Sequence, residues 1–197
     1  LTSFADACWG AQFGNALPPG TPIELFKFRS LSGYVICRSG GPVAWRALRQ
    51  EQTAQSSCEA EIYATNECVK DTIALKLIAE DLHMSDGSQC TQVYNDNEAC
   101  VAWSASVTNK GTKHLNLREN RVREAHLFQE VNVRHIPGQI NPSDLFTKEI
   151  KDASHFRRLR DCQMVSRANF LKYGHTVPAH ISTESLPYYS LSASVPA

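Results

Sequence analysis

Carboxylates stand at four points of this sequence where a strand is expected to end or a helix to begin. They are Asp6 near the end of a strand at 1–8, Glu61 in the first turn of a helix at 57–82, Asp96 directly after a strand at 91–95, and Asp144 at the opening of a helix after Pro142. Strand ends and helix starts on one edge of an α/β sheet converge, so these side chains can cluster. Oxygen ligands without His or Cys suit Mg²⁺ or Mn²⁺, and a pair of such ions can hold both oxygens of an in-line phosphoryl displacement.

The helix expected at 57–82 carries two glutamates in its first turn, and helical periodicity separates them. From Glu61, the positions one to four turns along are small or apolar; they are Ala64, Thr65, Cys68, Thr72 and Leu75. Glu59 lies roughly 200° away around the helix and begins a polar line. We therefore predict that Glu61 faces the protein and that Glu59 faces solvent. A buried carboxylate needs a cation or a partner, because burying it bare costs several kcal/mol.

The elements that must position these acids follow from periodicity and turn residues. Strands are expected at 1–8, 32–37, 42–45, 91–95 and 131–136, and helices at 57–82, 97–106, 115–129 and from Asn141 onward. The segment Arg38–Gly41 is typical of a hairpin turn between the second and third strands. This order predicts an α/β fold with a five-stranded mixed sheet, the first three strands antiparallel, flanked by helices.

Composition restricts the class of protein. The 197 residues include 20 Lys and Arg against 20 Asp and Glu, so a nucleic-acid contact would have to come from a local patch rather than a general positive field. The seven cysteines are odd in number and form no Cys-x-x-Cys pair, which favours free thiols in an intracellular protein. No apolar run is long enough for a membrane span. Because the chain begins at Leu1, we expect a piece of a larger polyprotein.

Six segments carry a resemblance to a known family. They are FADACWG, SLSGYVICRSGGPVAWRALRQ, SSCEAEIYA, VYNDNEA, TKHLNLR and HIPGQINPSDLFTK. In order and spacing they resemble the ribonuclease H domain at the C-terminal end of the Pol polyprotein of copia-type LTR retrotransposons, over about residues 1–160. We accordingly expect a ribonuclease H-like domain at 1–150, a C-terminal helical extension at 151–173 and a disordered tail at 174–197.

The resemblance implies a function and a set of partners. It implies an endonuclease that hydrolyses the RNA strand of RNA–DNA hybrids during reverse transcription, with Asp6, Glu61, Asp96 and Asp144 as catalytic residues and ligands of two Mg²⁺ ions, for which Mn²⁺ could substitute. Lys113, His114 and Arg118 would contact nucleic acid. The partners would be the hybrid and the reverse transcriptase part of the same polyprotein, with no membrane and no small-molecule cofactor. The location would be cytoplasmic, in a virus-like particle, or nuclear.

Three departures from the family pattern and several alternatives stand beside this interpretation. Cys8 occupies a position where the family often has a second acid, the loop between Gly10 and Phe28 is longer than is usual, and Gln139 follows Gly138 where many ribonucleases H have a histidine. Taken singly, each acid has a structural explanation: a turn former, half of an ion pair, a helix N-cap or a helix-start charge. The alternatives for the whole chain are a catalytically inactive module of a reverse transcriptase and another nuclease on the same fold. The tryptophans Trp45 and Trp103 are expected in the core.

Overall fold

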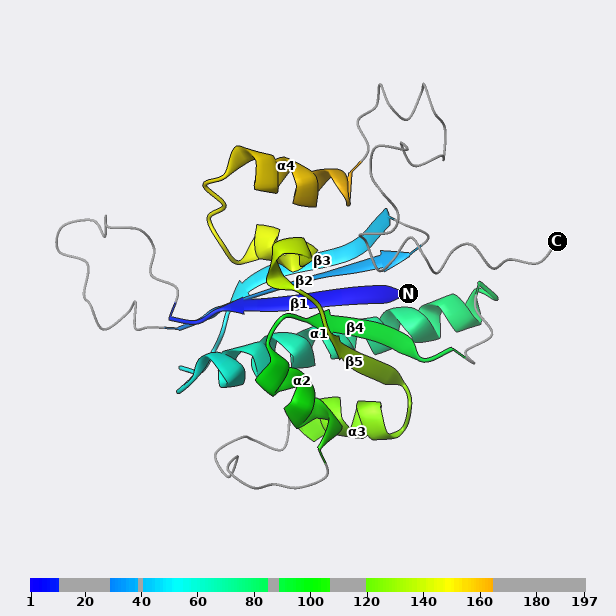
Figure 1. Ribbon diagram of the computed structural model, residues 1–197. Helices are drawn as coiled ribbons and strands as arrows, with labels where there is room; N and C mark the ends of the chain where they lie inside the picture. The colour runs from blue at the N-terminus through cyan, green and yellow to red at the C-terminus, as the bar shows by residue number, and fades with distance from the viewer. Residues whose placement is uncertain (11–28, 39–40, 85–88, 107–119, 165–197) are drawn as a thin grey trace, which may run out of the picture.

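The computed structural model describes residues 1–10, 29–38, 41–84, 89–106 and 120–164 (Figure 1). Over these residues the strands are β1 (Thr2–Cys8), β2 (Leu31–Arg38), β3 (Gly41–Arg49), β4 (Thr91–Asn95) and β5 (Val131–His135). The α-helices are α1 (Ser57–Asp81), α2 (Glu98–Ala105), α3 (Asn120–Leu127) and α4 (Ala153–Asp161). Two short 3₁₀ helices, η2 (Gly138–Ile140) and η3 (Pro142–Phe146), lie between β5 and α4.

The strands form one five-stranded sheet in the order β3-β2-β1-β4-β5. β1, β2 and β3 pair antiparallel, whereas β1 with β4 and β4 with β5 pair parallel. Parallel neighbours need a crossover connection, and α1 together with α2 and α3 provides it. The predicted fold class is therefore confirmed, including the antiparallel first three strands.

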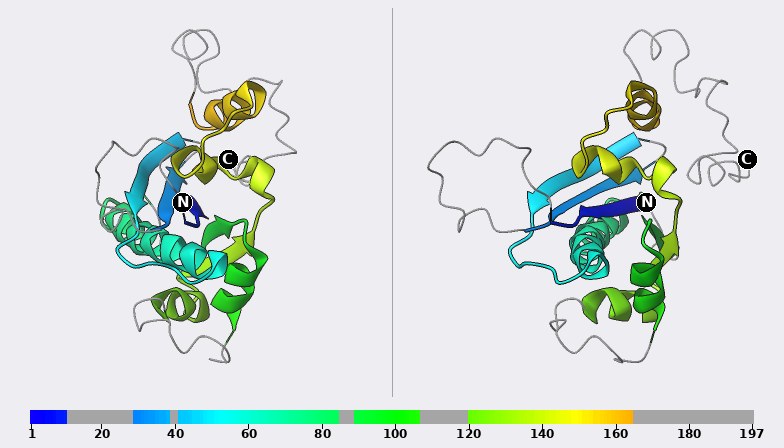
Figure 2. Two further views of the ribbon diagram at one scale, coloured as in Figure 1. Left: turned by 90° about the vertical axis from the view of Figure 1, so that its left-hand side faces the viewer. Right: turned by 60° about the vertical axis from the view of Figure 1, so that its left-hand side comes forward.

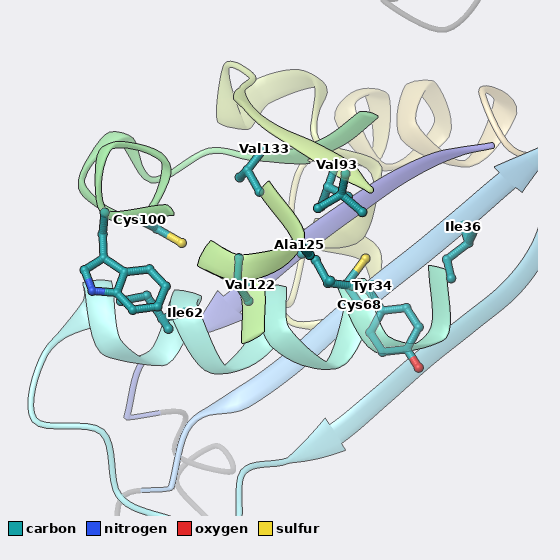
Figure 3. Packing of buried hydrophobic residues seen from close by; sticks show 13 residues of the cluster. Tyr34, Ile36, Ile62, Cys68, Val93, Cys100, Val122, Ala125 and Val133 are labelled. Carbon is teal, nitrogen blue, oxygen red and sulfur yellow. The ribbon is translucent and has the colours of Figure 1, made fainter. Parts of the chain in front are cut away.

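Helices cover the two faces of the sheet. Figure 2 shows α1 and α3 on one face and α4 on the other. The larger apolar cluster lies under α1, α2 and α3 and includes Ile62, Cys68, Val93, Cys100 and Val122 (Figure 3). A second cluster on the opposite face joins Phe4, Val35, Tyr94 and Ile136 to Cys162, which follows α4. The sheet is thus buried on both sides, as a layered α/β domain requires.

The start of α1 is fixed by a capping arrangement. The Ser56 side chain accepts a hydrogen bond from the backbone N–H of Glu59, and the Glu59 carboxylate accepts one from the N–H of Gln55. These reciprocal contacts satisfy donors that a helix N-terminus leaves unpaired. They also place Glu61 one turn into the helix, on the side that faces β1 and β4.

Five expectations need correction or restriction. The helix after Asn141 is the 3₁₀ helix η3 rather than an α-helix, and Trp45 is 61% exposed on edge strand β3, whereas Trp103 is buried as predicted. The helix expected at 115–129 is observed at Asn120–Leu127, with Leu127 exposed; residues 115–119 lie outside the described residues. The extension expected at 151–173 contains α4, but its residues 165–173 and the tail expected at 174–197 lie outside the described residues.

Candidate metal centre

The sheet topology brings Asp6 and Asp96 to the same edge. β1 and β4 are parallel neighbours in which Ala5 is level with Asn95, so Asp6, near the end of β1, lies beside Asp96, which follows β4. The N-terminal turn of α1 packs against this edge and supplies Glu61. This convergence of strand ends and a helix start is the arrangement that the positions of the acids predict.

The three carboxylates form a compact oxygen cluster. One carboxylate oxygen from each of Asp6, Glu61 and Asp96 lies within 4.8 Å of the others. Asp6 is fully buried and Glu61 is 6% exposed, whereas Asp96 is partly exposed. Carboxylates brought this close repel one another and retain few water contacts, so the cluster requires a positive charge.

Two asparagine side chains connect the helices and strands that carry the acids. Asn95 Nδ2 donates a hydrogen bond to Glu61 Oε2 at 2.9 Å, and it also contacts the Thr65 hydroxyl at 3.2 Å. Asn141 Nδ2 donates to the carbonyl oxygen of Ala5 at 3.1 Å, which ties the η3 segment to β1 beside Asp6. Both amides are fully buried, so they fix how α1, β4 and η3 meet at this edge.

Asp144 lies on η3, outside the group of three acids within 4.8 Å, and is connected to Asp6 through Lys148. The η3 segment approaches β2 closely. Asn141 caps η3, with Pro142 at its first position and Asp144 in its first turn. A Cβ atom on Gly33 would lie 2.6 Å from Thr147 Cγ2 and 2.8 Å from Phe146 Cβ, so only glycine fits there. Gly33 is the β2 partner of Asp6, and its missing side chain lets Thr147 donate a hydrogen bond to the Asp6 carboxylate.

The positive charge within the protein comes from Lys148. Its Nζ lies 3.0 Å from Asp6 Oδ1 and 2.8 Å from Asp144 Oδ1, and 3.7 Å from Asp96 Oδ2. One ammonium group therefore contacts acids from β1, from the end of β4 and from η3. Sequence reasoning missed this residue; the available signal was its spacing of four from Asp144 in the segment NPSDLFTK.

Electrostatics set the acids apart from ordinary surface carboxylates. Burial and then the charge of Asp6 raise the pKa of Glu61 to about 9, partly offset by the hydrogen bond from Asn95. The same two causes raise the pKa of Asp144 to about 6 and raise that of Asp96, and Lys148 offsets part of each shift. Burial lowers the pKa of Lys148, but Asp6 and Asp144 outweigh it and hold that pKa above its ordinary value. Asp6 is thus the acid whose charge acts on every other member of the site.

The prediction that Glu59 faces solvent is wrong. Glu59 is 5% exposed, and its carboxylate accepts hydrogen bonds from the Tyr63 hydroxyl at 2.8 Å and the Gln55 N–H at 2.7 Å. The segment before α1 folds back over the helix start and covers it, through contacts such as Gln50 Nε2 to the carbonyl of Ala60. Glu59 therefore organises the helix terminus, and the group of acids within 4.8 Å contains Glu61 instead.

Other sequence-based expectations have mixed outcomes. Asp96 is not the N-cap of α2, because Asn97 fills that position, and Asp6 lies within β1 rather than in a turn. The nucleic-acid contacts expected at Lys113, His114 and Arg118 lie outside the described residues. All seven cysteines are free, as expected. Within the described ranges, no helix combines the length and apolar character needed to cross a bilayer.

Comparison with known structures decides the fold. The LC11 ribonuclease H1, isolated from compost by a metagenomic approach, matches with a TM-score of 0.51 and 17% identity, covering 74% of this chain and 91% of that enzyme. The chain has a ribonuclease H fold. The same LC11 enzyme in complex with an RNA/DNA hybrid also matches, with a TM-score of 0.50 and 16% identity, over 74% of this chain and 92% of the other.

A comparison of sequences identifies a related protein. The retrovirus-related Pol polyprotein from transposon TNT 1-94 of Nicotiana tabacum is 31% identical over 128 residues, which are 64% of this chain. The match spans only 10% of the polyprotein's length. No family model matches the chain. The sequence match thus relates this chain to a short part of that polyprotein, and the structural matches show the ribonuclease H fold.

Proposed function

We propose that this chain is a metal-dependent endonuclease that hydrolyses the RNA strand of RNA–DNA hybrids during reverse transcription of a retrotransposon. The observation that carries the proposal is the cluster of Asp6, Glu61 and Asp96 oxygens within 4.8 Å, on a ribonuclease H fold and with Asp144 beside it. The similarity to a transposon Pol polyprotein supports reverse transcription as the setting, in a virus-like particle and beside the polymerase part of the same polyprotein.

The donor set fits a hard divalent cation. All the clustered side chains offer carboxylate oxygens, which Mg²⁺ and Mn²⁺ prefer, and the site already holds one positive group, the Lys148 ammonium. When bound by these oxygens, Mg²⁺ lowers the pKa of a coordinated water and neutralises charge that develops on the phosphate. Asp6, Glu61, Asp96 and Asp144 would hold two such ions.

The acids have different positions and so different roles. Asp6 is central, since its charge raises the pKa of each of the other acids, and it would be one of the residues that hold the metal. Glu61 is oriented by Asn95, and the missing side chain of Gly138 leaves room for Asp96, since a Cβ atom there would lie 2.9 Å from Asp96 Oδ2. Asp144 is carried by η3 and is buried, and Lys148 connects it to Asp6.

The RNA–DNA hybrid is proposed as the substrate because of the fold, and the balanced charge indicates how it would be recognised. The balance of acidic and basic residues gives no general attraction to nucleic acid, so recognition would depend on local contacts with phosphates and 2′-hydroxyl groups. We assign Lys113, His114 and Arg118 to phosphate contacts. Their alanine variants should weaken hybrid binding and reduce its salt dependence while leaving the acidic cluster intact.

The test is cleavage of end-labelled substrates by the purified chain. We expect Mg²⁺-dependent cutting of the RNA strand in an RNA–DNA hybrid, with a 3′-hydroxyl on the upstream product, and no cutting of matched RNA or DNA duplexes. EDTA and Asp96→Asn should each abolish cutting while circular dichroism remains that of a folded protein. Equal cutting of a DNA duplex would favour another nuclease on this fold. Hybrid binding without cutting in Mg²⁺ or Mn²⁺ would favour the catalytically inactive module.

A further inference from the structure

Lys148 contacts the same acids that a metal ion would use. Its ammonium hydrogen bonds to one oxygen of Asp6 and one of Asp144, and lies 3.7 Å from Asp96 Oδ2. Asp6 and Asp144 come from opposite ends of the described chain and would repel each other without it. The ammonium thus balances charge within the cluster in this structure.

A divalent cation and this ammonium compete for the same space and the same oxygens. Asp6 Oδ2 accepts a hydrogen bond from Thr147 and Oδ1 accepts one from Lys148, so a metal ion that binds through Oδ1 must take the place that the ammonium now occupies. The Lys148 side chain is 38% exposed, so the ammonium can move into solvent without opening the core. The ammonium can therefore be released, and the free energy needed to release it weakens metal binding.

We propose that Lys148 is an internal counter-ion that a divalent metal must displace, so that Lys148 sets the metal concentration at which the site fills. This inference rests on the proposed function in one respect, namely that the acids are metal ligands. Before metal binds, the ammonium holds Asp6 and Asp144 together; once metal binds, the carboxylates no longer need it. Lys148 is a positioning residue, and its effect should be large without metal and small with it.

The expected effect of Lys148 on metal affinity depends on how exposed its ion pairs are. A fully exposed ion pair is worth at most about a factor of five in an equilibrium constant, and a buried one considerably more. Lys148 lies between these cases, because it is partly exposed but contacts two buried carboxylates. We expect Lys148→Met to lower the Mg²⁺ concentration at half-saturation about tenfold.

The experiment follows thermal unfolding of chelator-treated protein during titration with MgCl₂ or CaCl₂, a readout that needs no catalysis. Without metal, Lys148→Met should melt below wild type; with saturating metal, the two should converge. Lys148→Arg keeps the charge and should stay near the wild-type midpoint. Lys151→Met removes the same charge from an exposed position three residues away and is the matched control, which should titrate like wild type.

A second measurement uses the wild-type protein and so does not depend on how a variant folds. An amine-reactive reagent followed by mass spectrometry should label Lys148 slowly in EDTA and faster in Mg²⁺, with Lys151 labelled equally in both. If Lys148→Met keeps the wild-type midpoint and is destabilised by the same margin with and without metal, Lys148 is only structural and the inference is overturned. If neither wild type nor Lys148→Met shifts with metal, while Lys148 labelling is unchanged, the proposed metal centre itself fails.

Discussion

Replacing Glu61 by Gln should stabilise the metal-free protein while abolishing its activity. Glu61 is almost completely buried beside Asp6, and its pKa is raised to about 9 from an ordinary 4.5. An acid whose pKa rises on folding favours the unfolded state at any pH above its unfolded value, because there the unfolded chain can ionise and the folded site resists it. The penalty is absent below pH 4.5, grows as the pH rises, and is complete near pH 9.

At pH 7 this penalty amounts to ~3 kcal/mol, since each unit between the unfolded pKa and the working pH contributes ~1.4 kcal/mol. Gln has the same shape and its amide oxygen can still accept the hydrogen bond from Asn95, although its NH₂ group cannot accept the one from the Ala7 backbone, so part of that free energy should be recovered. In EDTA, Glu61→Gln should therefore raise the free energy of unfolding by about 1–3 kcal/mol at pH 7. The gain should nearly vanish at pH 4.5, and hybrid cleavage in Mg²⁺ should be lost.

Glu59→Gln is the matched control, two residues away and equally buried. Its carboxylate serves the helix start through Gln55 and Tyr63, so this variant should lose about 1 kcal/mol of stability and retain hybrid cleavage. Urea denaturation in EDTA at pH 4.5, 7 and 8, with cleavage assays on the same preparations, measures both quantities. The reasoning fails if Glu61→Gln is destabilised at pH 7, or if the two variants change stability in the same direction.

Three further outcomes are expected. Gly33→Ala should cost about 1–3 kcal/mol in urea denaturation and reduce cleavage, because its Cβ would collide with Thr147 and Phe146. Gly41→Ala should be near neutral, because its Cβ would make only an ordinary 3.9 Å contact with the Arg38 carbonyl oxygen. Wild type should show a burst of cleavage followed by a slower steady rate, since Gln139 cannot take up a proton; Gln139→His should raise the steady rate more than the burst, and a linear progress curve would contradict this. A thiol reagent should modify Cys37 only after unfolding, because burial raises the pKa of its thiol to about 11, and native labelling of Cys37 as fast as of half-buried Cys90 would count against this.

His155 offers an alternative explanation for the rate of turnover, and the same cleavage assay can test it. His155 on α4 has its Nε2 3.0 Å from the backbone oxygen of Gln139. If His155 already supplies a protonatable group at this position, a His155→Gln variant should slow the steady rate. Unchanged turnover in that variant, together with faster turnover in Gln139→His, leaves the missing histidine as the cause.

Local patterns were sufficient for the sheet, for α1 and for the inward direction of Glu61. The stripe that begins at Glu61 is buried at Ala64, Thr65, Cys68 and Thr72, as helical spacing predicts. Strand β4 has the predicted bounds, because Thr91–Asn95 is short, rich in β-forming residues and bounded by turn residues. Such features depend on residues that are close together in the sequence, so a single sequence is enough to predict them.

Contacts between distant segments were not predictable in the same way. Glu59 is on the polar side of α1 by periodicity, yet the segment before the helix covers it. Lys148 resembles any lysine after a helical turn until η3 packs on β2 and directs it toward Asp6. Both depend on tertiary packing that no local period encodes, whereas Trp45 is exposed because β3 is an edge strand.

The central position of β1 determines when this site can form during synthesis. β1 is the first strand of this domain to be made, its partner β4 begins only at Thr91, and Lys148 is 142 residues from Asp6. Contacts of such sequence separation carry a high loop-closure cost and form slowly. A ribosome must therefore release nearly the whole described domain before Asp144 and Lys148 can join the other acids. Chains that stop early carry Asp6, Glu61 and Asp96 but lack the η3 segment, so an interrupted translation should yield no stray nuclease.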